Sequence, residues 1–78
     1  MALFKQAIDA YFETLRLSEL KHDSSGIAMA NGNIGLMYYH QTDWERALEF
    51  SFRSLTIFKA MNNLWEVSKI YNSIATIY

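Results

Sequence analysis

The sequence predicts an all-α fold in which antiparallel helix-turn-helix repeats stack side by side as an α-solenoid. Three observations lead to this prediction. Four stretches carry apolar residues at helical spacing, and short polar breaks separate them. The 78 residues include no proline and only three glycines, which favours long, uninterrupted helices. The second half of the chain is also similar to the first half when the sequence is shifted by 40 residues.

The first predicted helix covers residues 3–21. Its apolar residues recur at the spacing of one helical face, and its charged residues occupy the opposite face. A polar break follows at residues 21–26. Either Asp23 or Ser24 can cap the next helix there by accepting a hydrogen bond from a free backbone N–H. The second helix is then expected over residues 25–41.

The third predicted helix covers residues 43–60 and begins at a capping box, in which Thr42 is the N-cap and Glu45 is the partner three residues later. Its apolar arc spans about half of the helix circumference, which indicates contacts on two sides. The last break precedes a fourth helix at residues 64–78. Asn63 and Glu66 repeat the capping pattern at its start.

The shift by 40 residues superposes the first helix on the third and the second helix on the fourth. Identical residues fall at five pairs of positions: Ala7/Ala47, Phe12/Phe52, Leu15/Leu55, Ile34/Ile74 and Tyr38/Tyr78. Gly35 lies within the second helix, where glycine lowers helix stability by about 1 kcal/mol relative to alanine. A glycine at such a position indicates that another helix approaches too closely for a side chain. Ala75 at the equivalent position indicates that a methyl group is tolerated there. A repeated helical hairpin predicts a stacked array.

The stretch from residue 31 to residue 48 resembles the core of a tetratricopeptide repeat, whose signature is W-x2-L-G-x2-Y followed by A-x3-F. Ile34, Gly35 and Tyr38 occupy signature positions, and Asn31 and Ser51 depart from the expected tryptophan and phenylalanine. The 40-residue period is longer than the usual period of about 34 residues. The resemblance is therefore to the long-repeat subset of the family.

The resemblance implies a non-enzymatic protein–protein interaction or scaffold module whose partner is a protein or peptide. In the family's terms the helices follow in the order B, A, B, A, so we expect residues 1–78 to be a single fragment of a longer array. The resemblance also implies an alternative function, a regulatory or sensory segment of a bacterial signalling enzyme such as a diguanylate cyclase or histidine kinase.

In this family the A-helices line a concave groove that holds peptide ligands. The groove candidates that the resemblance implies are Met29, Gly32, Asn33, Leu36, Tyr39 and His40 in the second helix, and Lys69, Asn72, Ser73 and Thr76 in the fourth. Asn33 matches an asparagine that contacts the ligand backbone in peptide-binding members, and Ser73 replaces it in the second copy. The alternative is that these positions contribute only to stacking.

No catalytic motif is visible in the sequence, so we expect neither enzyme activity nor a cofactor. His22 and His40 lie on different segments without carboxylates at ligand spacing, and we expect no metal site. The net charge of −1 gives no basic footprint for nucleic acid. The chain lacks an apolar run of about 18 residues, so we expect no membrane insertion. The absence of cysteine is compatible with a reducing cytosol, and we expect a cytoplasmic protein.

The first and fourth helices each lack one neighbour of a continuous array, and each hairpin needs neighbours to bury its apolar face. We therefore expect a homo-oligomer, formed by head-to-tail stacking of copies or by an exchange of helices between them. The residues expected to form this contact are Phe4, Ala7, Ile8 and Tyr11 in the first helix, and Ile70, Ile74, Ala75 and Tyr78 in the fourth.

Overall fold

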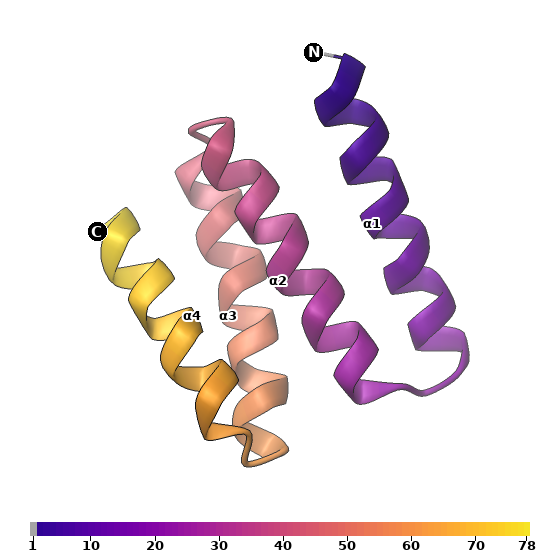
Figure 1. Cartoon of the computed structure of the whole chain (residues 1–78), viewed down its shortest axis with the longest axis vertical. Coiled ribbons are helices and arrows are strands. Elements are labelled where there is room, and N and C mark those ends of the chain that lie inside the picture. The colour runs from indigo at the N-terminus through magenta and orange to yellow at the C-terminus, as the bar shows by residue number, and fades with distance from the viewer. Residues whose placement is uncertain (1) are drawn as a thin grey trace.

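The computed structural model describes residues 2–78 and contains four helices. They are α1 (Ala2–Leu20), α2 (Ser24–His40), α3 (Trp44–Ala60) and α4 (Leu64–Ile77). Each helix runs antiparallel to the one before it, and α1 and α4 lie on opposite sides of the central pair α2 and α3 (Figure 1). No strand occurs in the part of the chain that the structure describes. The all-α prediction is confirmed, and the predicted helix ends are correct to within one residue.

Two hydrophobic clusters hold the helices together, and both include residues of α2 and α3. The first cluster joins α1 to the central pair through Ile8, Ile34 and Phe50. The second cluster joins α4 to the central pair, and its buried members are Ala28, Leu55, Phe58, Ile70 and Ile74. The outer helices are therefore both held by the central pair.

The backbones of α2 and α3 approach each other closely. A Cβ atom added to Gly35 would lie 3.0 Å from Ser51 Oγ and 3.2 Å from the Ala47 carbonyl oxygen. Seven residues earlier on α2, the Ala28 carbonyl oxygen accepts a buried hydrogen bond of 2.7 Å from Ser54 Oγ. The close approach that Gly35 predicted is therefore confirmed, and a side chain-to-backbone hydrogen bond reinforces it.

The three turns between helices share one conformation. His22, Thr42 and Asn62 have φ angles of 54°, 59° and 58°, in the left-handed region that glycine usually occupies. In each turn the N–H of the next residue donates to the carbonyl oxygen five residues before it, at 2.9 or 3.0 Å. This is the Schellman arrangement, which satisfies carbonyl groups at the end of one helix as the chain reverses.

The N-caps of α2, α3 and α4 are Asp23, Asp43 and Asn63. Each side chain accepts a hydrogen bond from the backbone N–H three residues later, at 3.1–3.3 Å. The predictions of Asp23 and Asn63 are confirmed, but the capping box at Thr42 is wrong. Thr42 occupies the left-handed position of the turn, and its hydroxyl donates to the Gln41 carbonyl oxygen. The cap therefore falls one residue later than the sequence suggested.

The ion pairs of residues 2–78 join positions three or four apart and lie mainly on the outer surface. In one of them the Arg16 guanidinium hydrogen-bonds to Glu13 and lowers the pKa of that carboxyl. Exposed pairs of this kind contribute little to stability because solvent screens them. Apolar packing and the buried Ser54 hydrogen bond therefore hold one helix against the next.

A glycine at the left-handed turn position should stabilise the fold. Thr42 is β-branched, and a left-handed conformation costs such a residue about 1–2 kcal/mol. We expect Thr42→Gly to raise the free energy of unfolding by about 1 kcal/mol in urea denaturation. Thr56→Gly, at an exposed position inside α3, is the matched control and should lower it by about 0.5 kcal/mol. A loss of stability in Thr42→Gly would contradict the assigned turn.

The sequence suggested that a methyl group would be tolerated at Gly35, but the contact there predicts that it would lower the free energy of unfolding. The equivalent residue Ala75 is exposed, so it does not report on tolerance at a helix–helix contact. We expect Gly35→Ala to lower the free energy of unfolding by about 1 kcal/mol and Gly35→Leu by about 3 kcal/mol, because both crowd the α3 backbone.

Gly32→Ala is the matched control for this prediction. Its added Cβ would meet only the side chain of Ser54, at 3.3 Å from Oγ. The gain in helix propensity, about 1 kcal/mol, should offset that contact. Equal stability of Gly35→Ala and the parent chain would show that the two backbones are farther apart than described.

Candidate functional site

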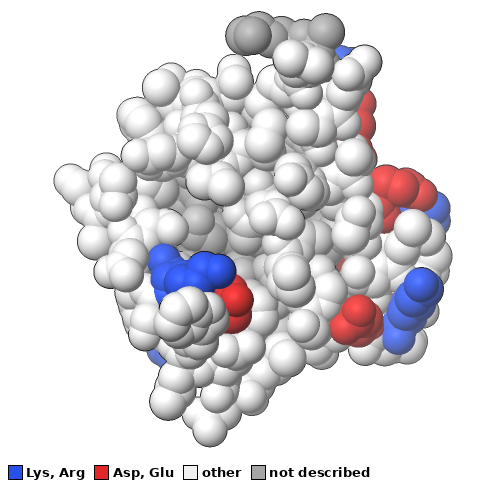
Figure 2. Space-filling model, viewed as in Figure 1, with Lys and Arg blue, Asp and Glu red and all other residues white. Residues whose placement is uncertain are grey.

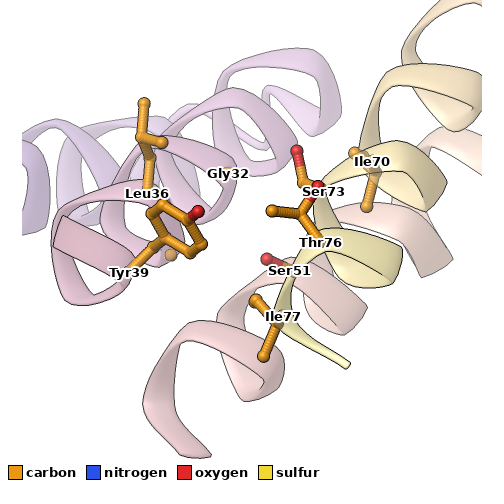
Figure 3. Close-up of a pocket in the computed structure, with 9 residues that line it drawn as sticks. Gly32, Leu36, Tyr39, Ser51, Ile70, Ser73, Thr76 and Ile77 are labelled. Carbon is orange, nitrogen blue, oxygen red and sulfur yellow. The ribbon is translucent and has the colours of Figure 1, made fainter. Parts of the chain in front are cut away.

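A groove runs between α2 and α4, and α3 forms its floor (Figure 3). It consists of two adjoining hollows of about 260 and 230 Å³. Both hollows are lined by Gly32, Leu36, Ile70 and Ser73, so they form parts of one continuous groove. Its concave shape and largely apolar lining with a few polar groups are typical of ligand-binding sites.

Small residues keep the floor of the groove open. Gly32 and Gly35 of α2 line the first hollow together with Ser51 of α3, and Ser54 lies on the floor of the second. Large side chains at these positions would fill the space between α2 and α4. The residues that allow α2 and α3 to pack closely therefore also create the groove.

The first hollow has predominantly apolar walls. Leu36 and Tyr39 of α2 line it on one side, and Thr76 and Ile77 of α4 line it on the other (Figure 3). Leu36 is 52% exposed and contributes apolar surface to this hollow. The Tyr39 ring packs edge-on against Trp44, with 5.5 Å between ring centroids, which fixes one wall of the hollow. This part of the groove suits an apolar side chain.

The second hollow is more polar. Met29 and Asn33 of α2 face Glu66 and Lys69 of α4 across it. Lys69 Nζ lies 3.5 Å from Glu66 Oε1. Figure 2 shows this face of the molecule as largely uncharged between α2 and α4, with one cluster of basic and acidic atoms over α4. The groove therefore changes along its length from apolar to polar.

Two hydroxyl groups of the groove, both on α4, are bonded to their own helix. Ser73 Oγ donates to the Lys69 carbonyl oxygen at 3.2 Å, and Thr76 Oγ1 donates to the Asn72 carbonyl oxygen at 2.9 Å. Their oxygens remain acceptors for N–H groups of a bound chain. Both hydroxyl groups can thus accept hydrogen bonds from a chain bound in the groove.

The structure brings together most of the groove candidates that the resemblance implied. The residues that line a hollow are Met29, Gly32, Asn33, Leu36, Tyr39, Lys69, Ser73 and Thr76. His40 and Asn72 line neither hollow. His40 is the last residue of α2 and its ring meets that of Tyr39, and Asn72 lies on an exposed part of α4 beside the groove.

Several lining residues were not predicted. They are Gly35, Ser51, Ser54, Phe58, Glu66, Ile70 and Ile77. Each of those on α4 lies three or four residues from either Lys69 or Ser73, so helical spacing would have included them. The α3 residues required the arrangement of three helices, which no local pattern in the sequence encodes.

The structure corrects the surface that the sequence predicted for self-association. Ile8, Ile70 and Ile74 are buried in the two clusters, and Phe4 and Tyr11 pack against the first. The most apolar face of each outer helix contacts the central pair, so the uncovered side lies elsewhere on the helix. Among the candidates, Ala75 and Tyr78 are exposed, and Phe4, Ala7 and Tyr11 are half-buried.

No family model, curated protein or solved structure matches the chain. Within residues 2–78, no three histidine or acidic side chains are grouped as metal ligands would be. The described helices also include none that is both long and apolar enough to cross a membrane. Functional inference therefore depends on the geometry of the groove.

Proposed function

We propose that this chain is a non-enzymatic protein–protein interaction module of the tetratricopeptide type, which binds a peptide or helix in the groove between α2 and α4. The observation that carries the proposal is the groove itself. It is continuous, largely uncharged and open to solvent, and it has an apolar half and a polar half. These features suit recognition of a chain segment by several side chains in succession.

The equivalence of the two halves of the chain supports a solenoid arrangement. Ile8 and Ile34 are members of the first cluster, and their equivalents Leu48 and Ile74 contribute to the second. The same 40-residue relation therefore holds in the packing as well as in the sequence. Under the proposal, α1 and α3 are B-helices, α2 and α4 are A-helices, and successive A-helices form the wall of a concave surface.

The ligand in this proposal presents one apolar anchor and a polar flank. The anchor enters the first hollow beside Leu36, Tyr39 and Ile77, where burial of a leucine-sized or larger side chain contributes about 1.5–3 kcal/mol. The flank extends to Asn33 and Lys69 in the second hollow. One anchor alone supports only weak binding, so contacts along both hollows are needed for micromolar affinity, about 8 kcal/mol.

The chemistry of the groove favours binding over catalysis. The hydroxyls of Ser54, Ser73 and Thr76 all donate to backbone carbonyl oxygens, which leaves none of the three activated as a nucleophile. Lys69 pairs with Glu66 on the surface. The groups that converge on the groove are therefore suited to hold a ligand.

A peptide selected from a phage-displayed random library on the immobilised chain tests this proposal. We expect Leu36→Ala to weaken its binding by about tenfold, since the lost apolar contact is worth about 1–2 kcal/mol. Ser73→Arg should abolish binding, because Ser73 lines both hollows and an arginine there would obstruct the groove. Isothermal titration calorimetry measures both effects.

Asn72→Arg is the matched control for this experiment, because Asn72 is the exposed neighbour of Ser73 and lines neither hollow. It adds the same charge to the same helix and should leave the affinity unchanged. Circular dichroism should show equal helicity in all variants. If Ser73→Arg bound the selected peptides as tightly as the parent chain, the groove would not be their binding site.

A further inference from the structure

Each outer helix carries an uncovered stripe that is separate from both the core and the groove. The stripe on α4 consists of Leu64, Ser68, Tyr71, Ala75 and Tyr78, all of them exposed. The stripe on α1 consists of Leu3, Ala7, Ala10, Thr14 and Leu17, of which only Ala7 is half-buried. In both stripes the intervals alternate between four and three residues, so each forms one continuous helical face. Neither stripe contains a charged residue.

The 40-residue equivalence maps the α4 stripe onto the face of α2 that contacts α3. The equivalents of Ser68, Ala75 and Tyr78 are Ala28, Gly35 and Tyr38. The Ala28 carbonyl accepts the hydrogen bond from Ser54, and Gly35 lies against Ser51 and Ala47. The ring of Tyr38 stacks on that of Phe50, with 5.8 Å between centroids.

The same equivalence maps the α1 stripe onto the face of α3 that contacts α2. The equivalents of Ala7, Ala10 and Thr14 are Ala47, Phe50 and Ser54, and all three of these touch α2. The two uncovered stripes are therefore the two halves of an interface that the chain already contains once. The helices that carry them, α1 and α4, lie on opposite sides of the central pair (Figure 1).

The stripes differ in size from the faces to which they are equivalent. Tyr71 stands where α2 has Asn31, so the α4 stripe is bulkier at that place. Ala10 stands where α3 has Phe50, so the α1 stripe has a recess there. In a contact with the geometry of α2 and α3, Tyr78 would lie over Ala10 as Tyr38 lies over Phe50.

We propose that the α4 stripe of one copy binds the α1 stripe of a second copy, head to tail, in the same orientation as α2 binds α3 but with the two helices farther apart, because Ala75 stands where α2 has Gly35. The contact is heterologous, and it continues from copy to copy unless the rotation closes a ring. The contact uses none of the residues that line the groove, so association and peptide binding can be tested independently of each other. A single pair of helices buries less than the roughly 1,200–2,000 Å² of stable interfaces, so we expect reversible association.

Analytical ultracentrifugation of the 78-residue chain tests the proposal across concentrations up to about 1 mM. The average mass of the parent chain should rise above the monomer mass of 9.1 kDa. Ala10→Glu blocks the α1 stripe, and Tyr71→Glu blocks the α4 stripe. Each variant alone should associate at least about tenfold more weakly, because an unpaired carboxylate would be buried in the contact.

An equimolar mixture of the two variants distinguishes a head-to-tail contact from a symmetric one. Ala10→Glu retains an intact α4 stripe and Tyr71→Glu retains an intact α1 stripe, so the mixture should form a dimer and nothing larger. Trp65→Glu is the matched control, since it replaces an exposed aromatic residue of α4 outside the stripe and should associate like the parent chain. All variants should keep the parent's helicity and melting temperature at low concentration.

Three results would overturn the proposal. The first is a parent chain that stays monomeric throughout the concentration series. In that case the stripes would not bind a second copy, and their partner would be a helix of another protein. The second is association of either stripe variant as strong as that of the parent chain. The third is a mixture that remains monomeric.

Discussion

The contact between α2 and α3 is the constraint on which the rest of the structure depends. Gly35 brings the two backbones within about a methyl group of each other, and the buried hydrogen bond from Ser54 to the Ala28 carbonyl fixes their register. Both hydrophobic clusters include residues from these two helices. The outer helices pack their apolar faces against this central pair, so each helix contacts mainly its neighbours in the chain, as helices in repeat proteins do.

The same constraint shapes the surfaces that we propose as binding sites. Small residues at Gly32, Gly35 and Ser51 let the central helices approach, and they leave an open floor between α2 and α4. The uncovered stripe of α4 is equivalent to the face of α2 that contacts α3, and the uncovered stripe of α1 is equivalent to the face of α3 that contacts α2. For this reason we propose that the two stripes bind each other between copies. The groove that we propose for a peptide and the two stripes that we propose for association thus follow from one pattern of small and large residues.

The sequence predicted those features that depend on local patterns. It did not predict features that depend on packing between residues far apart in the chain. Helical spacing and polar breaks are local, so the four helices were predicted to within one residue. Ile8, Ile70 and Ile74 mark a buried face, but periodicity does not say which neighbour buries it, and the predicted association surface was misplaced for this reason. Thr42 was predicted as a cap because threonine is a common N-cap residue. The Schellman turn instead places it in the left-handed conformation, which its residue type does not indicate. Groove positions on α2 and α4 were predicted by resemblance, whereas the floor depends on α3.

Native-state hydrogen exchange tests the central claim most directly, at concentrations where the chain is monomeric. If α2 and α3 form the unit on which the other helices depend, their amides should exchange slowest and only through global unfolding. Amides of α1 and α4 should exchange through local opening that is easier by at least about 1 kcal/mol. Protection of α1 or α4 equal to or greater than that of α2 and α3 would contradict this account.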